Sequence, residues 1–265
     1  MHSSFTAIAS VNKDLKEVDI ETTMYPPYFN IDKSGKLSGI SYQIANEVFK
    51  KAGYKANFNV LPYKRAVLNL FDKKDGIMMG IFAGIPGYEK MTITEVSYLL
   101  FPTTYFYNSK LRPEYSSITK IDQTKGKKVL VLAGTSLYED IITNSGGQAI
   151  KLTNESQVLA MLEAGRADFA HTSLLSGLHS IQMNPSYSIL RALPFYTSAF
   201  ASGVVFREDS FEVRDAYLKA IKKMHKSGEL IEIAKKAFKA YPSLDYSHMF
   251  LKNIGEKTNI PVSTQ

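Results

Sequence analysis

The chain has 265 residues, of which 45% are hydrophobic and 22% are charged, a balance typical of a globular protein with one large core or two smaller ones. Its formal net charge is +7, but the basic residues are spread along the chain, so nucleic acid is not an expected partner. The absence of cysteine excludes disulfides, thiolate catalysis and cysteine-ligated metals, and no apolar run approaches the ~20 residues needed to span a bilayer.

The first predicted strand runs from Val18 to Thr23, where apolar and polar residues alternate. It ends at Met24-Tyr25-Pro26-Pro27-Tyr28, because two prolines cannot continue a hydrogen-bonded ladder. Tyr25 or Tyr28 then lies at the carboxyl end of the strand, where it either stacks on a ligand or packs against the prolines. Upstream, Ala7-Ile8-Ala9 has the form of a signal-peptidase site without a basic or adequate apolar stretch before it, so we expect either a removed signal peptide or a chance match.

Helices and strands alternate in the next segment. Turn residues from Asn30 to Gly39 predict a hairpin-like excursion, and the apolar spacing from Ser38 to Ala52 predicts an amphipathic helix. Tyr54 to Val60 is predicted as a strand, and Leu61-Pro62-Tyr63-Lys64-Arg65 opens another helix. Arg65 lies on the first turn of that helix, where it either contacts an anionic group or is a solvent-exposed helix residue.

Asp75 to Asn108 is the stretch around which we expect the fold to be organised. Ile77 to Phe82 has the apolar and small residues of a strand covered on both faces, and the chain then breaks at a glycine- and proline-containing loop, residues 83–87. In an open α/β sheet, ligands bind at loops that follow the carboxyl ends of strands. The loop is followed by Lys90 and by a polar segment, Thr92 to Ser97, which we place before the next strand. That strand is the aromatic run from Phe101 to Tyr107, and we expect it to cross between two lobes.

A second set of strands and helices follows this crossing. Val129 to Leu132 is a short buried strand that leads into Gly134-Thr135-Ser136, where hydroxyl residues open a helix. Such a helix start either binds an anion through free N–H groups or is a simple N-cap, and without a following Gly-Lys-Ser/Thr it is not a P-loop. A later strand, Ala167 to His171, ends at His171-Thr172-Ser173, and no second histidine lies at metal-ligand spacing, so we expect no metal site.

The return crossing is predicted by two aromatic and β-branched runs, Leu190 to Phe195 and Phe200 to Phe206, with small polar residues between them. Two amphipathic helices, Glu212 to His225 and Glu229 to Ala240, follow, and from Tyr241 onward the pattern is lost. The chain has no Gly-x-Ser-x-Gly motif and no Ser-His-Asp order that would favour hydrolysis, and no cofactor is expected.

Several local sequences occur in a fixed order along residues 18–240. They are Tyr25-Pro26-Pro27-Tyr28 after the first strand, Gly39 to Gly53 as the first helix, Gly126-Lys127-Lys128-Val129 before Gly134-Thr135-Ser136, Gly165-Arg166-Ala167-Asp168 before a strand, and Lys226-Ser227-Gly228-Glu229-Leu230 with Ile233-Ala234-Lys235-Lys236 near the end. Together they resemble the bacterial extracellular solute-binding proteins of family 3, the amino-acid-type receptors that supply ABC importers.

The resemblance implies an α/β fold of the type II periplasmic-binding-protein class, a two-lobed clamp in which each lobe is a mixed sheet flanked by helices and two hinge strands join the lobes. We expect residues 1–103 with 200–265 to form lobe 1, and residues 104–199 to form lobe 2. The implied protein is a non-catalytic monomer, periplasmic or extracellular and membrane-anchored. Its expected partners are a small-molecule ligand and the membrane subunits of an ABC permease, with no cofactor.

Two departures from the family pattern bear on the ligand. Amino-acid binders of this family usually hold the α-carboxylate with an arginine after Thr-Pro-Glu, and the α-ammonium with an aspartate a few residues beyond Gly-Arg-x-Asp. Lys90 and Ser173 stand at these positions here. A lysine cannot reproduce the bidentate guanidinium fork, and a serine cannot neutralise a buried ammonium. We therefore expect a small polar or aromatic-bearing metabolite other than a standard α-amino acid, in a pocket whose loop at 83–87 lacks the usual hydroxyls.

The predicted site has aromatic walls and polar ends. The candidate walls are Tyr25, Tyr63, Phe82 and Tyr196, although each could instead belong to the core. A negative or carbonyl group is expected to be held by Lys90, Arg65 and the helix start at Gly134, Thr135 and Ser136. His171 and Ser173 are expected to hydrogen-bond to the ligand from lobe 2.

Two other function classes compete with this prediction. Some relatives dehydrate cyclic diacids within the same clamp, which requires a general acid, and Glu89, Glu95 and Glu139 are the carboxylates considered for it. Each is equally explained as a surface or helix-capping residue. The third class is the ligand-binding sensor domain of a receptor. The sequence has no membrane-spanning run, which argues against this class.

Overall fold

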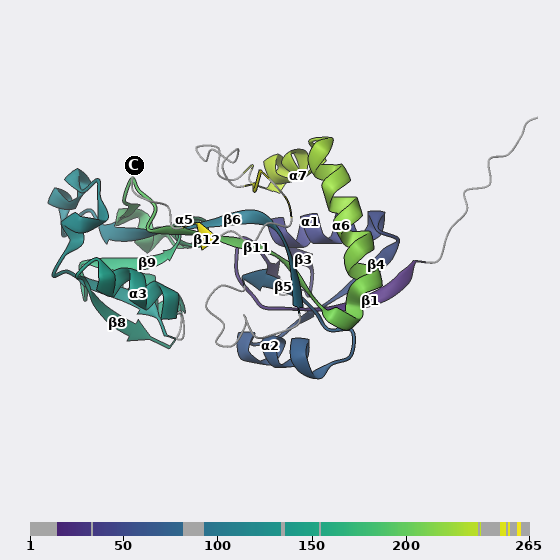
Figure 1. Cartoon of the computed structure of the whole chain (residues 1–265). Coiled ribbons are helices and arrows are strands. Elements are labelled where there is room, and N and C mark those ends of the chain that lie inside the picture. Colours follow the sequence, from purple (N-terminus) through teal and green to yellow (C-terminus); the bar gives the residue numbers. More distant parts are fainter. Residues whose placement is uncertain are drawn as a thin grey trace, which may run out of the picture.

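The structure is a computed structural model, and it describes residues 15–32, 34–81, 93–133, 136–153, 155–237, 239, 250–252, 254 and 259–260. A mixed sheet runs through the whole molecule in the order β4-β1-β5-β11-β6-β9-β7-β8, with β10 paired to β6 and β12 to β11. Figure 1 shows that the helices gather in two bodies, one at each end of this sheet. The predicted two-lobed α/β fold is therefore confirmed.

Lobe 1 is a sheet with helices on both faces. Its strands β1 (Lys16–Thr22), β4 (Tyr54–Val60) and β5 (Ile77–Ile81) are followed in the sheet by the antiparallel β11 (Ser198–Arg207). The helices α1 (Ile40–Lys51), α6 (Phe211–Lys226) and α7 (Glu229–Ala237) cover one face, and α2 (Tyr63–Asp72) covers the other (Figure 1). The predicted hairpin consists of β2 (Asn30–Ile31) and β3 (Leu37–Ser38).

Lobe 2 has the same layered design. The parallel strands are β7 (Lys128–Leu132), β8 (Gln148–Leu152) and β9 (Phe169–Ser173), and β10 (Leu190–Ala192) pairs with the edge formed by β6 (Ile93–Asn108). The helix α3 (Ser136–Asn144) packs on one face, and α4 (Glu155–Glu163) and α5 (Leu174–Met183) pack on the other. The connections include the short 3-10 helices Pro113–Ser117, Ile121–Thr124, Pro185–Ile189 and Glu208–Ser210.

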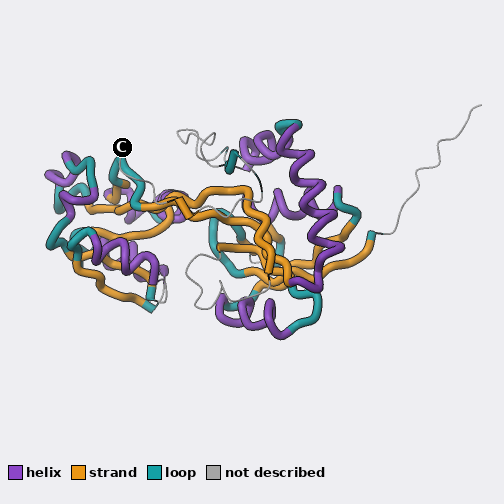
Figure 2. Tube along the Cα trace, in the orientation of Figure 1, coloured by secondary structure: helices purple, strands orange, loops and turns teal. Residues whose placement is uncertain are grey.

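Two long strands, β6 and β11, connect the lobes. Along residues 93–103, β6 pairs with β11, and along residues 103–108 it pairs with β9 and β10 of lobe 2. Figure 2 shows both strands as extended segments running from one body to the other. The strand prediction at 101–107 was right but too short, because residues 93–97, expected to be a polar segment before the strand, already pair with β11.

One helix of lobe 2, α5, was not predicted from the sequence. It contains Ser176, Gly177 and Ser180, residue types that weaken a helical pattern. Gly177 is nevertheless required there, since a Cβ at this position would lie 2.2 Å from the Phe106 ring. The close approach of α5 to β6 therefore explains why tertiary packing outweighs a poor local helix propensity.

The chain contains no membrane-crossing helix within its described ranges. The longest described helix, α6, has 16 residues, and lysines and acidic residues are spread along it. Much later in the chain, β12 (Asn259–Ile260) pairs with Ala199 and Phe200 of β11.

Candidate functional site

The carboxyl ends of parallel strands from both lobes reach the same stretch of β6 and β11. In lobe 1, Ile81 ends β5 and pairs with Ser202 of β11. In lobe 2, Ser173 ends β9 and pairs with Thr103 of β6, which itself pairs with Ser198 of β11. Ser198 and Ser202 are only four residues apart, ~13 Å along a strand. Because ligands of open α/β sheets bind outside the carboxyl ends of strands, this stretch is the candidate site.

An aromatic stack, defined by Tyr25, Tyr28 and Phe101, forms the lobe 1 side of this region. The loop after β1 is held tight, since the Tyr25 N–H donates to the Phe29 carbonyl at 2.9 Å and the Phe29 N–H donates back to Tyr25 at 3.0 Å. The Tyr28 ring stacks on Phe101 with centroids 3.5 Å apart, and Tyr25 lies 5.4 Å from Phe101. Both tyrosines therefore pack on Phe101, a contact that the sequence did not predict, and Tyr25 remains partly exposed.

Tyr28 also carries a direct contact between the lobes. Its hydroxyl shares a 3.0 Å hydrogen bond with Ser173 Oγ of lobe 2, and the two residues are 2% and 0% exposed. A second contact lies beside it, where Ser176 Oγ donates to the Pro26 carbonyl at 2.9 Å. Burial raises the pKa of the Tyr28 hydroxyl, so this pair is neutral at physiological pH.

A hydroxyl cluster, defined by Thr103, His171, Thr197 and Ser198, forms the lobe 2 side. Thr197 Oγ1 lies 2.7 Å from both Thr103 Oγ1 and His171 Nε2, and Ser198 Oγ lies 2.9 Å from Thr103 Oγ1. These bonds tie both crossing strands to the end of β9. The cluster therefore fixes the relative position of three strands at the point where the lobes meet.

His171 is the only titratable group of this cluster. Its side chain is 1% exposed, and burial lowers its pKa to about 3, so the imidazole is neutral. The rings of Tyr105 and Tyr138 meet it edge-on at 5.4 Å and 4.8 Å. His171 Nδ1 has no hydrogen-bond partner among the residues that the structure describes. A buried, neutral imidazole of this kind is a hydrogen-bonding group and not a source of charge.

The predicted residues of α2 and the return crossing are accessible. Tyr63 begins α2 and is 41% exposed, Arg65 is exposed on the same first turn, and Tyr196 is 47% exposed. The Leu61 N–H donates to the Thr22 carbonyl at 2.8 Å, which holds the start of α2 beside the end of β1. The structure thus keeps Tyr63 and Arg65 near the carboxyl end of β1, while His171 and Ser173 are buried.

Other predicted residues lie outside the described part of the chain. These are Phe82, Lys90, Gly134 and Thr135, and the side chain of Ser136 is likewise not described. The backbone of Ser136 begins α3, as the sequence predicted for this helix start.

Two of the carboxylates considered for catalysis are engaged elsewhere. Glu139 of α3 forms an ion pair with Lys151 of β8 at 2.5 Å. Glu95 accepts a hydrogen bond from Ser97 near the beginning of β6, eight residues before Thr103 and thus ~26 Å along the strand. Glu89 lies outside the described residues. Within the described ranges, no group of three or more His, Cys, Asp or Glu side chains is arranged to hold a metal ion.

Most of the contacts that organise the site were not predicted from the sequence. Phe101 was expected only as part of a crossing strand, and Thr103 was not singled out. The small polar residues at 197–198 had been noticed only as a break between two strands. Their signal was present, because both crossing strands carry hydroxyl residues amid aromatic runs, Thr103 in one and Thr197 with Ser198 in the other.

The sequence of the chain matches a known protein family. The sequence profile of the bacterial extracellular solute-binding proteins, family 3, matches residues 17–240. The chain is 25% identical to the L-cystine-binding protein TcyA of Bacillus subtilis (strain 168) over 227 residues, which cover 85% of this chain and 82% of that protein.

Solved structures share the fold. The probable amino-acid ABC transporter extracellular-binding protein ytmK of Bacillus subtilis superimposes with a TM-score of 0.70 at 20% identity, covering 84% of this chain and 98% of that one. A histidine kinase sensor domain with similarity to periplasmic binding proteins gives the same TM-score at 17% identity, covering 84% and 96%.

Proposed function

The chain belongs to the bacterial extracellular solute-binding proteins of family 3, and from this premise we propose that it captures a small polar metabolite by closing its two lobes and delivers it to the membrane subunits of an ABC importer. The proposed ligand is not a standard α-amino acid. The proposed lobes are residues 1–103 with 200–265 and residues 104–199, which move about the crossing strands β6 and β11.

One observation carries the ligand proposal, the buried pair of Tyr28 and Ser173. An ammonium group that is removed from water needs a counter-charge, because an unpaired buried ion is strongly unfavourable. Ser173 offers only a hydroxyl, which is fully buried and already bonded to the neutral Tyr28 hydroxyl. His171, the neighbouring titratable group, is neutral because burial lowers its pKa to about 3. This side of the site therefore favours a ligand without an ammonium group.

The opposite end of the ligand is proposed to be anionic or carbonyl-bearing. We propose that Lys90 and Arg65 provide positive charge for this end, and that the helix start at Gly134, Thr135 and Ser136 provides backbone N–H donors. The proposed aromatic walls are Tyr25, Tyr63, Phe82 and Tyr196. His171 and Ser173 complete the proposed set from lobe 2, and because both are buried, they reach a ligand only when the Tyr28–Ser173 contact opens.

The same proposal includes a non-catalytic role, a monomeric state and a periplasmic or membrane-anchored location. Its matched relatives are named as binding proteins, which supports the absence of catalysis. The position of Glu95 near the beginning of β6 supports it further, since it keeps this carboxylate away from the strand ends where a general acid would be needed.

A thermal-shift experiment with variants tests this site. The purified chain is screened against organic acids, aromatic metabolites and amino acids, and a ligand at ~100 times its dissociation constant should stabilise the native state by about 2.7 kcal/mol. Lys90→Ala and Tyr25→Ala should each reduce the shift produced by the hit. Lys110→Ala, an exposed lysine of lobe 2, is the matched control. The residue assignment is wrong when both variants retain the full shift.

A further inference from the structure

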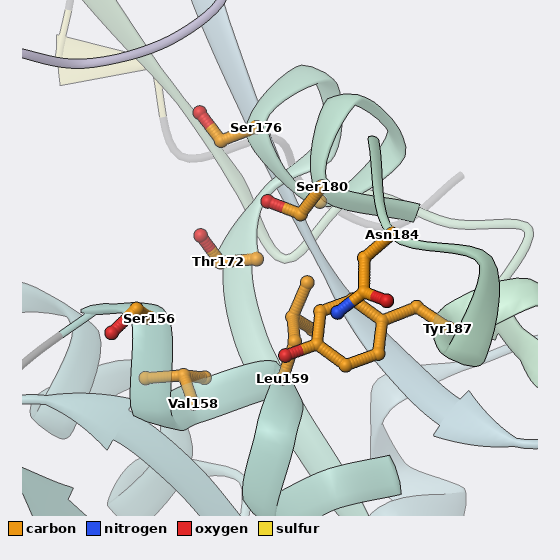
Figure 3. Close-up of a pocket in the computed structure, with 9 residues that line it drawn as sticks. Ser156, Val158, Leu159, Thr172, Ser176, Ser180, Asn184 and Tyr187 are labelled. Atoms are coloured by element: carbon orange, nitrogen blue, oxygen red, sulfur yellow. The ribbon is translucent and has the colours of Figure 1, made fainter. Parts of the chain in front are cut away.

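A hollow of about 230 Å³ lies in lobe 2 between α4, α5 and the end of β9. Its polar lining consists of Ser156, Thr172, Ser176, Ser180, Asn184 and Tyr187. Figure 3 shows that these side chains come from three directions, with Ser156 on α4, Ser176 and Ser180 on successive turns of α5, and Tyr187 on the segment that follows α5. This volume is smaller than the ~300–1,000 Å³ of pockets for drug-sized ligands, so the hollow suits a small molecule.

The hollow is separate from the site at the strand ends. Successive residues of a strand point to opposite faces of the sheet, so Thr172 faces away from the side on which His171 lies. His171 packs against Tyr105 and Tyr138 on the α3 side, whereas the hollow is on the side covered by α4 and α5.

The described part of the lining is polar and uncharged. None of the described side chains that line the hollow belongs to an Asp, Glu, Lys, Arg or His. An ion bound here would find no counter-charge among these side chains, so they favour a neutral molecule over an anion or a cation. An apolar molecule would displace water from several hydroxyl groups without replacing their hydrogen bonds, which is also unfavourable.

Several hydrogen-bonding positions of this lining remain available. Ser180 Oγ and Tyr187 Oη form no hydrogen bond with any described residue. Asn184 Oδ1 already accepts from the Ser186 N–H at 3.2 Å and from Ser186 Oγ at 3.0 Å, which leaves the amide NH2 group as a donor. Ser176 Oγ donates to the Pro26 carbonyl and can still accept through its lone pairs.

We propose that this hollow is a second binding site, for a small neutral molecule rich in hydroxyl groups, such as a monosaccharide or a cyclic polyol. Each hydroxyl of such a molecule both donates and accepts, which matches the free hydroxyls of Ser180 and Tyr187, the amide donor of Asn184 and the acceptor lone pairs of Ser176. Leu159 and the Tyr187 ring supply apolar surface for its C–H groups.

Binding in the hollow also reaches the contact between the lobes. Ser176 lines the hollow and donates to the Pro26 carbonyl of lobe 1, so a bound polyol that donates to Ser176 Oγ polarises and strengthens that inter-lobe hydrogen bond. The second site thereby favours the arrangement of the lobes in which the Ser176–Pro26 bond is formed.

Calorimetric titration of the full chain with glucose and with myo-inositol tests the proposal. We expect saturable binding of at least one probe with a dissociation constant on the order of 1 mM. Ser180→Leu, which fills the hollow, should weaken it roughly tenfold, and Tyr187→Phe, which removes only a hydroxyl, should weaken it about threefold. Ser188→Leu, at an exposed position of the same 3-10 turn as Tyr187, should leave it unchanged.

Two outcomes overturn the second site, namely the absence of saturable binding for both probes, or binding that is equally tight in the Ser180→Leu and Tyr187→Phe proteins. Tyr187→Phe keeps the test valid if Ser180→Leu perturbs folding. Ser180 and Tyr187, the two substituted positions, lie outside the site at the strand ends. The thermal-shift response of these variants to the ligand of that site therefore distinguishes failure of the second site from failure of the proposed function.

Discussion

The two sides of the lobe junction are stabilised by different physics. On the lobe 1 side, the aromatic stack of Tyr25, Tyr28 and Phe101 depends on apolar burial and ring contact. On the lobe 2 side, the hydroxyl cluster around His171 depends on buried hydrogen bonds between polar groups. The stabilisation gained by burying aromatic rings does not depend on pH. A buried, neutral imidazole, in contrast, makes the folded state less stable relative to the unfolded state when the solution becomes acidic. The comparison predicts that the two sides respond differently to mutation and to pH.

The largest expected effect is on the aromatic stack. Phe101→Ala removes a ring that is 2% exposed and leaves Tyr28 without its stacking partner, so the free energy of unfolding should fall by about 3–5 kcal/mol. Denaturant unfolding monitored by circular dichroism measures it. Phe211→Ala, at a 53% exposed ring, is the matched control and should change stability by less than about 0.5 kcal/mol. Equal losses of stability in both variants would show that the stacked ring of Phe101 stabilises the fold no more than the exposed ring of Phe211 does.

Acid should act mainly on the other side, through His171. Its ordinary pKa is 6.5, and burial lowers it to about 3 in the folded protein. Below pH 6.5 the unfolded chain therefore binds a proton that the folded protein does not, so this contribution is fully present above pH 6.5 and is lost as the pH falls toward 3. The expected slope approaches ~1.4 kcal/mol per pH unit in that interval.

The measurement for this prediction is the free energy of unfolding between pH 7 and pH 4 for the wild type and His171→Gln. The variant should show a shallower fall in stability on acidification. His179, whose pKa is also lowered by burial, contributes in the same direction, and His179→Gln shows how much of the slope belongs to it. An identical pH dependence in the wild type and His171→Gln would contradict the account of a neutral, buried imidazole.

A smaller effect is expected where the two sides meet, at the Tyr28–Ser173 hydrogen bond. Tyr28→Phe or Ser173→Ala leaves one buried hydroxyl without its partner and should lower the free energy of unfolding by about 1–3 kcal/mol. The double variant should cost less than the sum of the two single ones, because the second change removes the unpaired group. Strict additivity in this double-mutant cycle would mean that the contact is not formed in solution.

Local structure was predictable wherever the chain itself carries the signal. The strand at 54–60 was predicted with the bounds observed, and the apolar positions Ile40, Ile44, Ala45, Val48 and Phe49 all face the core of lobe 1. Both signals are periodic and short-range, so no information about distant residues is needed to read them. The family resemblance followed from the same local patterns taken in sequence.

Contacts between distant residues could not be predicted in the same way. Tyr28 and Ser173 are 145 positions apart, and Thr103 and Thr197 are 94 apart, so their pairing depends on how the two lobes fold together. Helix α5 was missed for a related reason, since Gly177 looks unfavourable until the neighbouring Phe106 ring is known. The sequence thus predicted that the candidate site lies at loops after strand ends. It did not predict the buried contacts of that site.

The central claim is that the site selects against an ammonium group, and calorimetry with matched pairs of compounds tests it most directly. Each pair consists of a standard amino acid and the same molecule with hydrogen in place of the α-ammonium, for example tyrosine with 3-(4-hydroxyphenyl)propionate and histidine with imidazole propionate. The buried, neutral Tyr28–Ser173 pair predicts tighter binding of the member without ammonium in any pair that binds. Tighter binding of the amino acid itself would contradict the claim.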